Sequence, residues 1–172
     1  MSDAVLQDPM LAPVLEQRDD IGRMVALTWH GAGTDDGHGN ERWLVAVDGS
    51  NYSLRAVAMA ARLGVREEQV AAVDLVHVQS WLNKEAAETE LARRGWAATA
   101  QARRLLEAAG IRWRLYALMG EEAPEIARLA EALGSLGIVM GSRGLTGTES
   151  VLLGSVAQKV LHLAKTAVLI VR

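Results

Sequence analysis

The chain has 172 residues and a mass of 18.5 kDa, a length that predicts one domain with at most a modest extension. Half of its residues are hydrophobic and 23% are charged, which excludes a disordered or collagen-like chain and indicates a soluble globular fold. Its net charge of -3 argues against a general nucleic-acid binder, and the absence of cysteine excludes disulfides, a thiol nucleophile and thiolate metal sites.

The N-terminal sequence resembles neither a secretory signal nor a membrane anchor. It begins with the acidic stretch Met1-Ser2-Asp3-Ala4, where a signal peptide would be basic, and no apolar core follows. No run of residues approaches the roughly 18 apolar residues that are needed to span a bilayer. We therefore expect a cytoplasmic protein that does not insert into membranes.

The first forty residues differ in pattern from the rest. Residues 1–23 contain acids and two prolines but no clear period, and we interpret them as a loosely ordered arm. Residues 24–30 (MVALTWH) predict an extra strand, and the glycine-rich linker over 31–40 leaves open a hairpin with the strand that follows it. We divide the chain into a partly flexible N-terminal extension, 1–41, and a domain, 42–172.

From Trp43 onward, strands and helices alternate. Helical spacing predicts four helices, at residues 51–63, 83–109, 121–133 and 155–164, and short apolar runs predict five strands, at residues 43–47, 70–78, 111–118, 136–140 and 167–171. This alternation implies right-handed crossovers and an α/β fold, with a doubly wound parallel sheet that has helices on both faces. The alternating apolar and polar residues of 111–118 predict an edge strand with one exposed face.

The segment after the fourth of these strands is the strongest candidate for a binding site. In open α/β sheets, ligands bind at the carboxyl ends of the strands, and Gly141, Gly144 and Gly154 let a ligand approach the backbone closely. Gly154 and Ser155 then open a helix, whose free N–H groups favour an anion such as phosphate. The segment is neither a Walker A loop nor a dinucleotide fingerprint. On spacing alone, a phosphate site and a surface loop are equally supported.

Three stretches carry a resemblance to a known family: WLVAVDGSNYSLRAVAMAARL, LVHV and IVMGSRGLTGTESVLLGSVAQKVLHLAKTAVLIV. They are similar to the first strand and helix, the second strand and the last third of the universal stress protein family. The nucleotide motif of that family is glycine, two residues, glycine, nine residues, then glycine and serine or threonine. Gly141, Gly144, Gly154 and Ser155 meet this spacing without a gap. The chain departs from the family at two positions. It has Leu136 before the fourth strand, where the family often has Asp, and Ala167 before the fifth strand, where the family often has Pro. Both departures affect packing more than binding.

The resemblance implies a five-stranded parallel sheet of order 3-2-1-4-5 and a homodimer formed through the last strand. It also implies that ATP binds between the first and fourth strands, with Mg2+ held through its phosphates. The sequence does not decide between ATP, AMP and a cyclic nucleotide.

By analogy with the family, the phosphates and ribose would lie against the glycines and the start of the last helix, at Gly141, Gly144, Gly154, Ser155, Val156 and Ala157. Asp48 and the backbone at Val78 would contact the nucleoside, and the base would lie against Ala46, Val47 and Met140. Ser142 and Arg143 lie inside the loop and either contact a phosphate or are simply solvated. The alternative for Asp48 is a helix cap, and we interpret His77 as a hydrogen-bonded core histidine.

We therefore expect a stress-response regulatory protein that senses nucleotide and signals through its dimer or through an unidentified protein partner. Slow ATP hydrolysis or autophosphorylation ranks second, because no residue is an obvious base for an attacking water. A dimerisation or adaptor module without nucleotide is the third alternative. We predict no catalytic residue and no protein-only metal site, because His30 and His38, with Asp35 and Asp36, match no ligand spacing.

Overall fold

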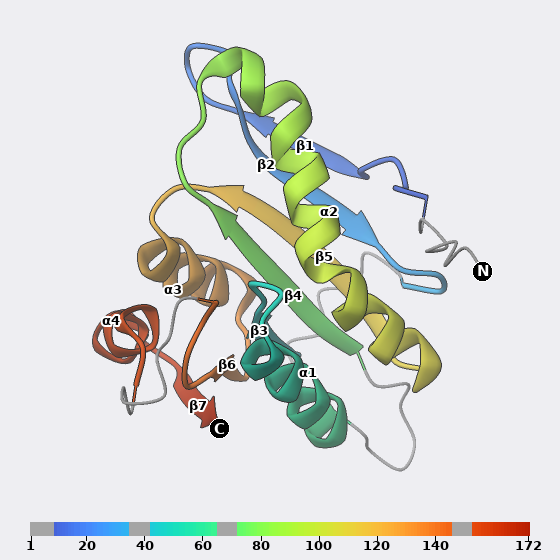
Figure 1. The fold of residues 1–172 in the computed structure, drawn as a ribbon, viewed down its shortest axis with the longest axis vertical. Coiled ribbons are helices and arrows are strands. Elements are labelled where there is room, and N and C mark those ends of the chain that lie inside the picture. The colour runs from blue at the N-terminus through green and yellow to red at the C-terminus, as the bar shows by residue number, and fades with distance from the viewer. Residues whose placement is uncertain (1–8, 35–41, 65–71, 146–152) are drawn as a thin grey trace, which may run out of the picture.

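One mixed sheet organises the chain. The computed structural model describes residues 9–34, 42–64, 72–145 and 153–172. Within these residues the sheet has seven strands in the order β1-β2-β5-β4-β3-β6-β7 (Figure 1). The strands are β1 Leu15–Arg18, β2 Met24–His30, β3 Trp43–Ala46, β4 Ala72–Gln79, β5 Arg112–Met119, β6 Gly137–Gly141 and β7 Ala167–Val171.

The five strands predicted from Trp43 onward are present and parallel. β3 pairs with β4 and β6, while β4 also pairs with β5 and β6 with β7. Counted along the chain from Trp43, this is the order 3-2-1-4-5, so the predicted fold is confirmed. The order reverses at β3, whose neighbours β4 and β6 lead to opposite halves of the sheet. Such a reversal is the point at which open α/β sheets bind ligands.

Two helices cover each face of the sheet. The helices are α1 Asn51–Gly64, α2 Lys84–Ala108, α3 Glu122–Leu133 and α4 Ser155–Leu163. Alternate residues of each strand enter two apolar clusters: in β3, Val45 packs with α1 and α2, whereas Leu44 packs with α3 and α4. Figure 1 shows α2 crossing in front of the strands, with α1 beside it. Within the described residues, no helix combines the length and the apolar character needed to cross a membrane.

Local signals set the ends of three helices. Asn83 caps α2, because its Oδ1 accepts a hydrogen bond from the Ala86 N–H at 2.8 Å. Ser50 does the same for α1, where its Oγ accepts from the Ser53 N–H at 3.2 Å. Caps of this kind contribute about 1 kcal/mol each. At the end of α3, Gly134 adopts a φ of 61°, the left-handed conformation that costs glycine least.

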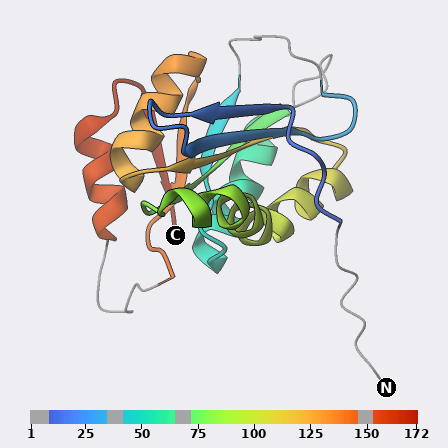
Figure 2. The same ribbon diagram turned by 90° about the horizontal axis from the view of Figure 1, so that it is seen from above.

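The N-terminal residues 9–34 join the sheet. β2 pairs antiparallel with β5, and β1, a strand that the sequence analysis did not predict, pairs antiparallel with β2. The hairpin between β2 and β3 that the analysis left open does not form, since β5 and β4 lie between them. Trp29 of β2 is fully buried, and its indole N–H donates to the carbonyl of Leu11 at 2.9 Å. Figure 2 shows β1 and β2 side by side along one edge of the sheet.

β5 is not an edge strand, contrary to the prediction, because it lies between β4 and β2. Its central arginine, Arg114, is accommodated by ion pairing instead of by solvent. Nε and Nη2 of Arg114 donate to the two carboxylate oxygens of Asp74 at 2.7 and 2.8 Å, and both side chains are at most 8% exposed. Nη1 of Arg42 lies 3.7 Å from the same carboxylate. One position of the polar alternation that resembles a solvated face, Arg114, therefore belongs to a buried ion-pair cluster.

Candidate functional site

The candidate site lies at the carboxyl edge of the sheet, where β3 and β6 are neighbours. The glycine-rich segment after β6 begins and ends at this edge. The Ser142 N–H donates to the Val171 carbonyl and the Gly154 N–H donates to the Ser142 carbonyl, both at 2.7 Å. The two ends of the segment therefore meet where α4 begins, although its central residues, 146–152, lie outside the described residues.

Asp48 links the end of β3 to this segment. Its Oδ1 accepts from the Ser50 N–H at 2.9 Å, and its Oδ2 accepts from the Leu145 N–H at 3.0 Å. The side chain that caps α1 is Ser50, so the carboxylate of Asp48 does not serve as the cap and instead holds the loop. An ionised carboxylate offers about four acceptor positions. Asp48 therefore keeps acceptor capacity for a ligand after making both protein hydrogen bonds.

The three motif glycines are not equally required by the packing around them. A Cβ atom at Gly141 would lie 2.7 Å from the Cβ of Tyr52, and one at Gly144 would lie 2.7 Å from Oδ2 of Asp48. Packing within the protein therefore already favours glycine at both positions. Among the described residues, the nearest neighbours of a Cβ at Gly154 would lie 3.5 Å away, an ordinary contact. The packing of the described residues therefore does not explain that glycine.

Within the part of the chain that the structure describes, the first turn of α4 presents backbone N–H groups without a hydrogen-bond acceptor next to Gly154. Gly154 is the N-cap residue, and it makes no side-chain cap hydrogen bond. The Gln158 N–H donates to the Gly154 carbonyl at 3.0 Å, so the N–H groups of Ser155, Val156 and Ala157 precede the helical hydrogen bonds. Ser155 is exposed, whereas Val156 is half-buried and Ala157 buried. This arrangement is suited to an anion, because the helix dipole adds to the free donors.

Five of the predicted ligand-lining residues share one apolar cluster on the face covered by α3 and α4: Ala46, Val78, Met140, Val156 and Ala157. Val47 differs from them, because its side chain is 3% exposed and belongs to the cluster under α1 and α2. Its backbone N–H donates to the carbonyl of Val76 at 2.8 Å. The structure therefore brings Ala46 and Met140 together and places the Val47 side chain on the opposite face of the sheet.

Comparison with known proteins decides the family. A sequence profile of the Universal stress protein family matches residues 39–172. The chain belongs to this family. Universal stress protein YxiE of Bacillus subtilis is 32% identical over 151 residues, which cover 76% of this chain and 98% of that protein. Universal stress protein MJ0531 of Methanocaldococcus jannaschii is 32% identical over 136 residues, covering 75% of this chain and 80% of that protein.

Solved structures share the universal stress protein fold. The hypothetical protein MJ0577 matches with a TM-score of 0.67 and 24% identity over 77% of this chain and 95% of that chain. A universal stress protein in complex with cAMP matches at 0.60 and 26% identity, over 77% and 97%. The Archaeoglobus fulgidus universal stress protein in complex with dAMP matches at 0.61 and 21% identity, over 77% and 98%. The first and third of these likenesses concern the fold alone.

Two side chains outside the predicted ligand set support the site in this universal stress protein. Nδ1 of His77 lies 2.9 Å from the Val47 carbonyl. Because a carbonyl oxygen only accepts, this nitrogen carries the proton and donates. The predicted hydrogen bond is therefore present, although His77 is half-buried instead of part of the core. Tyr52, which the sequence analysis did not single out, accepts from Nη1 of Arg143 at 2.8 Å. Its position in the first turn of α1, two residues after the cap Ser50, was the available signal.

The described residues hold no protein-only metal centre. Across residues 9–34, 42–64, 72–145 and 153–172, no group of three or more His, Asp or Glu side chains is placed to hold a metal ion. Of the residues considered for metal binding, Asp35, Asp36 and His38 lie outside the described residues, and His30 ends β2.

Proposed function

We propose that this universal stress protein binds ATP at the carboxyl edge of its sheet and acts as a nucleotide-dependent regulatory protein. The observation that carries the proposal is the start of α4, where N–H groups without an acceptor among the described residues follow a glycine that the packing of those residues does not require. Free N–H groups bind anions, and a missing Cβ lets a phosphate approach the backbone. The relatives solved with cAMP and dAMP support a nucleotide as the ligand.

The parts of a nucleotide match the parts of the site. In this proposal, Asp48 and the backbone at Val78 contact the nucleoside, and the base packs against Ala46 and Met140 of the apolar cluster. Mg2+ would be bound through the phosphates of the nucleotide alone. The residues that hold the phosphates and ribose are Gly141, Gly144, Gly154, Ser155, Val156 and Ala157.

The two inner residues of the loop have separate roles in the proposal. Ser142 is 2% exposed, and both its backbone groups bond to the protein, so it supports the loop. Arg143 lies against α1, with Cζ 5.4 Å from the centroid of the Tyr52 ring. Its Nη1 already donates to the Tyr52 hydroxyl, so a phosphate would compete with Tyr52 for this nitrogen. We expect Arg143 to contribute less to binding than the backbone donors of α4.

Signalling would use a homodimer formed through β7. This strand lies at one end of the sheet, and its last four residues are only partly buried. An edge strand with apolar side chains and unpaired backbone groups is suited to pairing with a second chain. Sedimentation or light scattering measures the mass directly, and the mass of one chain at all concentrations would contradict the dimer. To identify the protein partner that recognises the nucleotide-bound state, the proteins captured by this chain with and without ATP are compared.

The direct test is to identify and titrate the ligand. Freshly purified protein is denatured, and the released small molecules are separated by anion exchange with mass detection. The stripped protein is then titrated calorimetrically with MgATP, AMP and cAMP. We expect ATP to be released or to bind on titration. Protein that releases no nucleotide and binds none of the three would refute nucleotide binding and leave the adaptor function as the better account.

The variant Gly154→Ala tests the site. We expect the free energy of unfolding to change by less than about 0.5 kcal/mol, because the new Cβ makes ordinary contacts. We also expect ATP affinity to fall about tenfold or more, a loss of about 1.4 kcal/mol. Leu161→Ala, exposed on the same helix, is the matched control and should leave affinity unchanged. Equal affinity of Gly154→Ala and wild type would place the phosphates elsewhere.

A further inference from the structure

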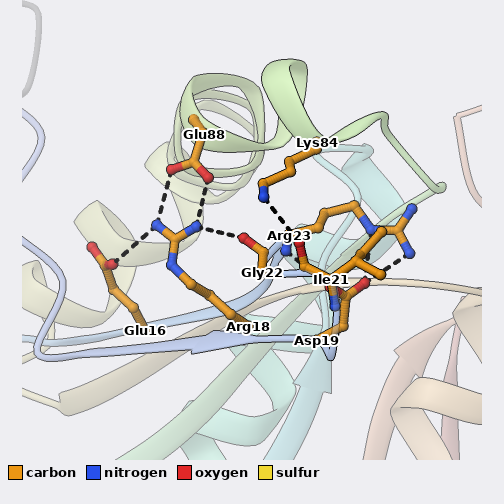
Figure 3. A network of polar contacts seen from close by, with 8 residues as sticks. All are labelled: Glu16, Arg18, Asp19, Ile21, Gly22, Arg23, Lys84 and Glu88. Atoms are coloured by element: carbon orange, nitrogen blue, oxygen red, sulfur yellow. Dashed lines mark hydrogen bonds and ion pairs between the residues drawn. The ribbon is translucent and has the colours of Figure 1, made fainter.

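The turn of the N-terminal hairpin is tied to the segment that follows β4. Figure 3 shows this network. Arg18 donates to both carboxylate oxygens of Glu88 on α2, at 2.6 and 2.9 Å, and to the carbonyl of Gly22 at 3.0 Å. Nζ of Lys84 donates to the carbonyl of Ile21 at 2.9 Å. Several contacts therefore hold residues 18–23 against residues 81–88.

These contacts lie at the edge of the sheet that carries the candidate site. β2 runs antiparallel to β5, with Ala26 opposite Leu118, so the turn before β2 lies beside the carboxyl end of β5. Gln79 pairs with Met119 in the parallel ladder, which places the end of β4 at the same level. The connection between β4 and α2 therefore lies between the hairpin turn and Val78, which is proposed to contact the nucleoside.

Trp81 lies in this connection and is presented to solvent. Its residue surface is 58% exposed, although Cζ of Arg23 lies 4.6 Å from the centroid of its ring. Arg23 is fixed in turn, since its Nε donates to Asp19 at 2.9 Å and its Nη1 reaches the Leu82 carbonyl at 3.4 Å. The Leu82 N–H donates to Sδ of Met119 at 3.1 Å. The indole therefore has a cation against one face and keeps more than half of its residue surface exposed.

We propose that Trp81, oriented by Arg23 of the N-terminal hairpin, is a stacking surface for the purine base of the nucleotide. This inference rests on the proposed nucleotide-binding function, and it assigns a positioning role to Arg23, which lies outside the family region that begins at residue 39. An aromatic ring offers a base a flat apolar surface, and the guanidinium on its far face is attracted to the same ring. Arg23 is a positioning residue, because it acts through Trp81.

The test separates contacts to the base from contacts to the phosphates. The probes are MgATP, which has a base, and inorganic tripolyphosphate with magnesium, which has none. We expect Trp81→Ala to weaken MgATP binding about 10- to 100-fold, the range typical of base–aromatic stacking, with tripolyphosphate affinity unchanged. Trp81→Phe should recover most of the MgATP affinity, because a smaller ring still stacks. If the Trp81 indole stacks on the base, the tryptophan fluorescence of the wild type should change on adding ATP. The fluorescence of Trp81→Phe should not change.

Arg23→Gln tests the positioning role. It removes the cation and keeps much of the stem, and we expect a smaller, twofold to fivefold loss of MgATP affinity with no change for tripolyphosphate. Arg93→Gln is the matched control, since Arg93 is an exposed arginine of α2 that pairs with Glu90. Both variants should bind tripolyphosphate as wild type does. A loss with Arg93→Gln equal to that of Arg23→Gln would refute the role of the hairpin.

Three outcomes are distinguishable. Unchanged MgATP affinity in Trp81→Ala overturns the inference and leaves nucleotide binding intact. Equal losses for MgATP and tripolyphosphate assign Trp81 a purely structural role and also overturn it. Wild-type protein that binds neither probe refutes the proposed function itself, and the stacking role with it.

Discussion

Replacing Gly144 by alanine tests the link between Asp48 and the glycine loop. The new Cβ would lie 2.7 Å from Oδ2 of Asp48, closer than a Cβ and an oxygen approach in folded proteins. The backbone of Gly144 does not adopt a positive φ, so backbone strain adds nothing. Asp48 must therefore move, and the hydrogen bond that Oδ2 accepts from the Leu145 N–H at 3.0 Å is weakened.

The size of the effect follows from this one contact. A hydrogen bond to a charged group contributes about 1.5–3 kcal/mol, and the exposure of Leu145 places this one at the lower end. Alanine also restricts the unfolded chain, which stabilises the fold by about 0.4–1 kcal/mol. We expect a net loss of about 1 kcal/mol in the free energy of unfolding. ATP affinity should fall about tenfold or more, because the same movement displaces a ligand-contacting carboxylate.

A double-mutant cycle with Asp48→Ala checks the reasoning. Urea denaturation gives the free energy of unfolding of the wild type, the two single variants and the double variant. In the Asp48→Ala background the clash and the hydrogen bond are both absent, so Gly144→Ala should stabilise the fold there by about 0.4–1 kcal/mol through the unfolded chain. The coupling should then be about 1.5 kcal/mol, the contribution of the hydrogen bond. Costs that add to within about 0.3 kcal/mol would show that the two residues are independent, and the account of Gly144 would be refuted.

Three further predictions concern the rest of the fold. Asp74→Asn leaves the buried Arg114 without its carboxylate and should lower the free energy of unfolding by about 3–5 kcal/mol; a loss under about 1 kcal/mol in urea denaturation would contradict this. Burial raises the pKa of Tyr116 to about 12, so its stabilising contribution is complete below pH 10 and is lost between pH 10 and 12. Tyr116→Phe should therefore flatten the alkaline fall in stability. Gly31→Ala places a Cβ 2.7 Å from the Trp113 indole and should cost about 1–3 kcal/mol by overpacking, whereas an unchanged melting temperature would show that this segment is not part of the core.

The helices and strands of the family region were predictable because the spacing of apolar residues that specifies each of them is a local feature of the sequence. The apolar run from Trp43 and the helical spacing after Asp48 depend on neighbours along the chain, and strand and helix follow from them. The carboxyl ends of parallel strands also meet at one edge whatever the side chains are. This is why Asp48, Gly141 and Gly154 could be assigned to one site before any contact was known.

What could not be predicted depends on partners distant in sequence. Arg114 alternates with apolar residues as a solvated side chain would, and its burial follows from Asp74 on the neighbouring strand. β1 carries no apolar period because all four of its residues are exposed, and it exists through pairing with β2. The face of the sheet on which the Val47 side chain lies was also not predictable, because a continuous apolar run does not show which of the two faces a side chain takes.

The glycine motif alone is weaker evidence for a ligand than its spacing indicates. The protein's own packing already favours glycine beside Tyr52 and beside Asp48, at Gly141 and Gly144. A chain that had lost its nucleotide would therefore still be expected to keep these two glycines for stability. Gly154 differs, since alanine fits there without a close contact to any described residue and its φ of -69° suits any residue. The evidence for a ligand thus concentrates at Gly154 and the free donors of α4, where a substitution can separate binding from folding.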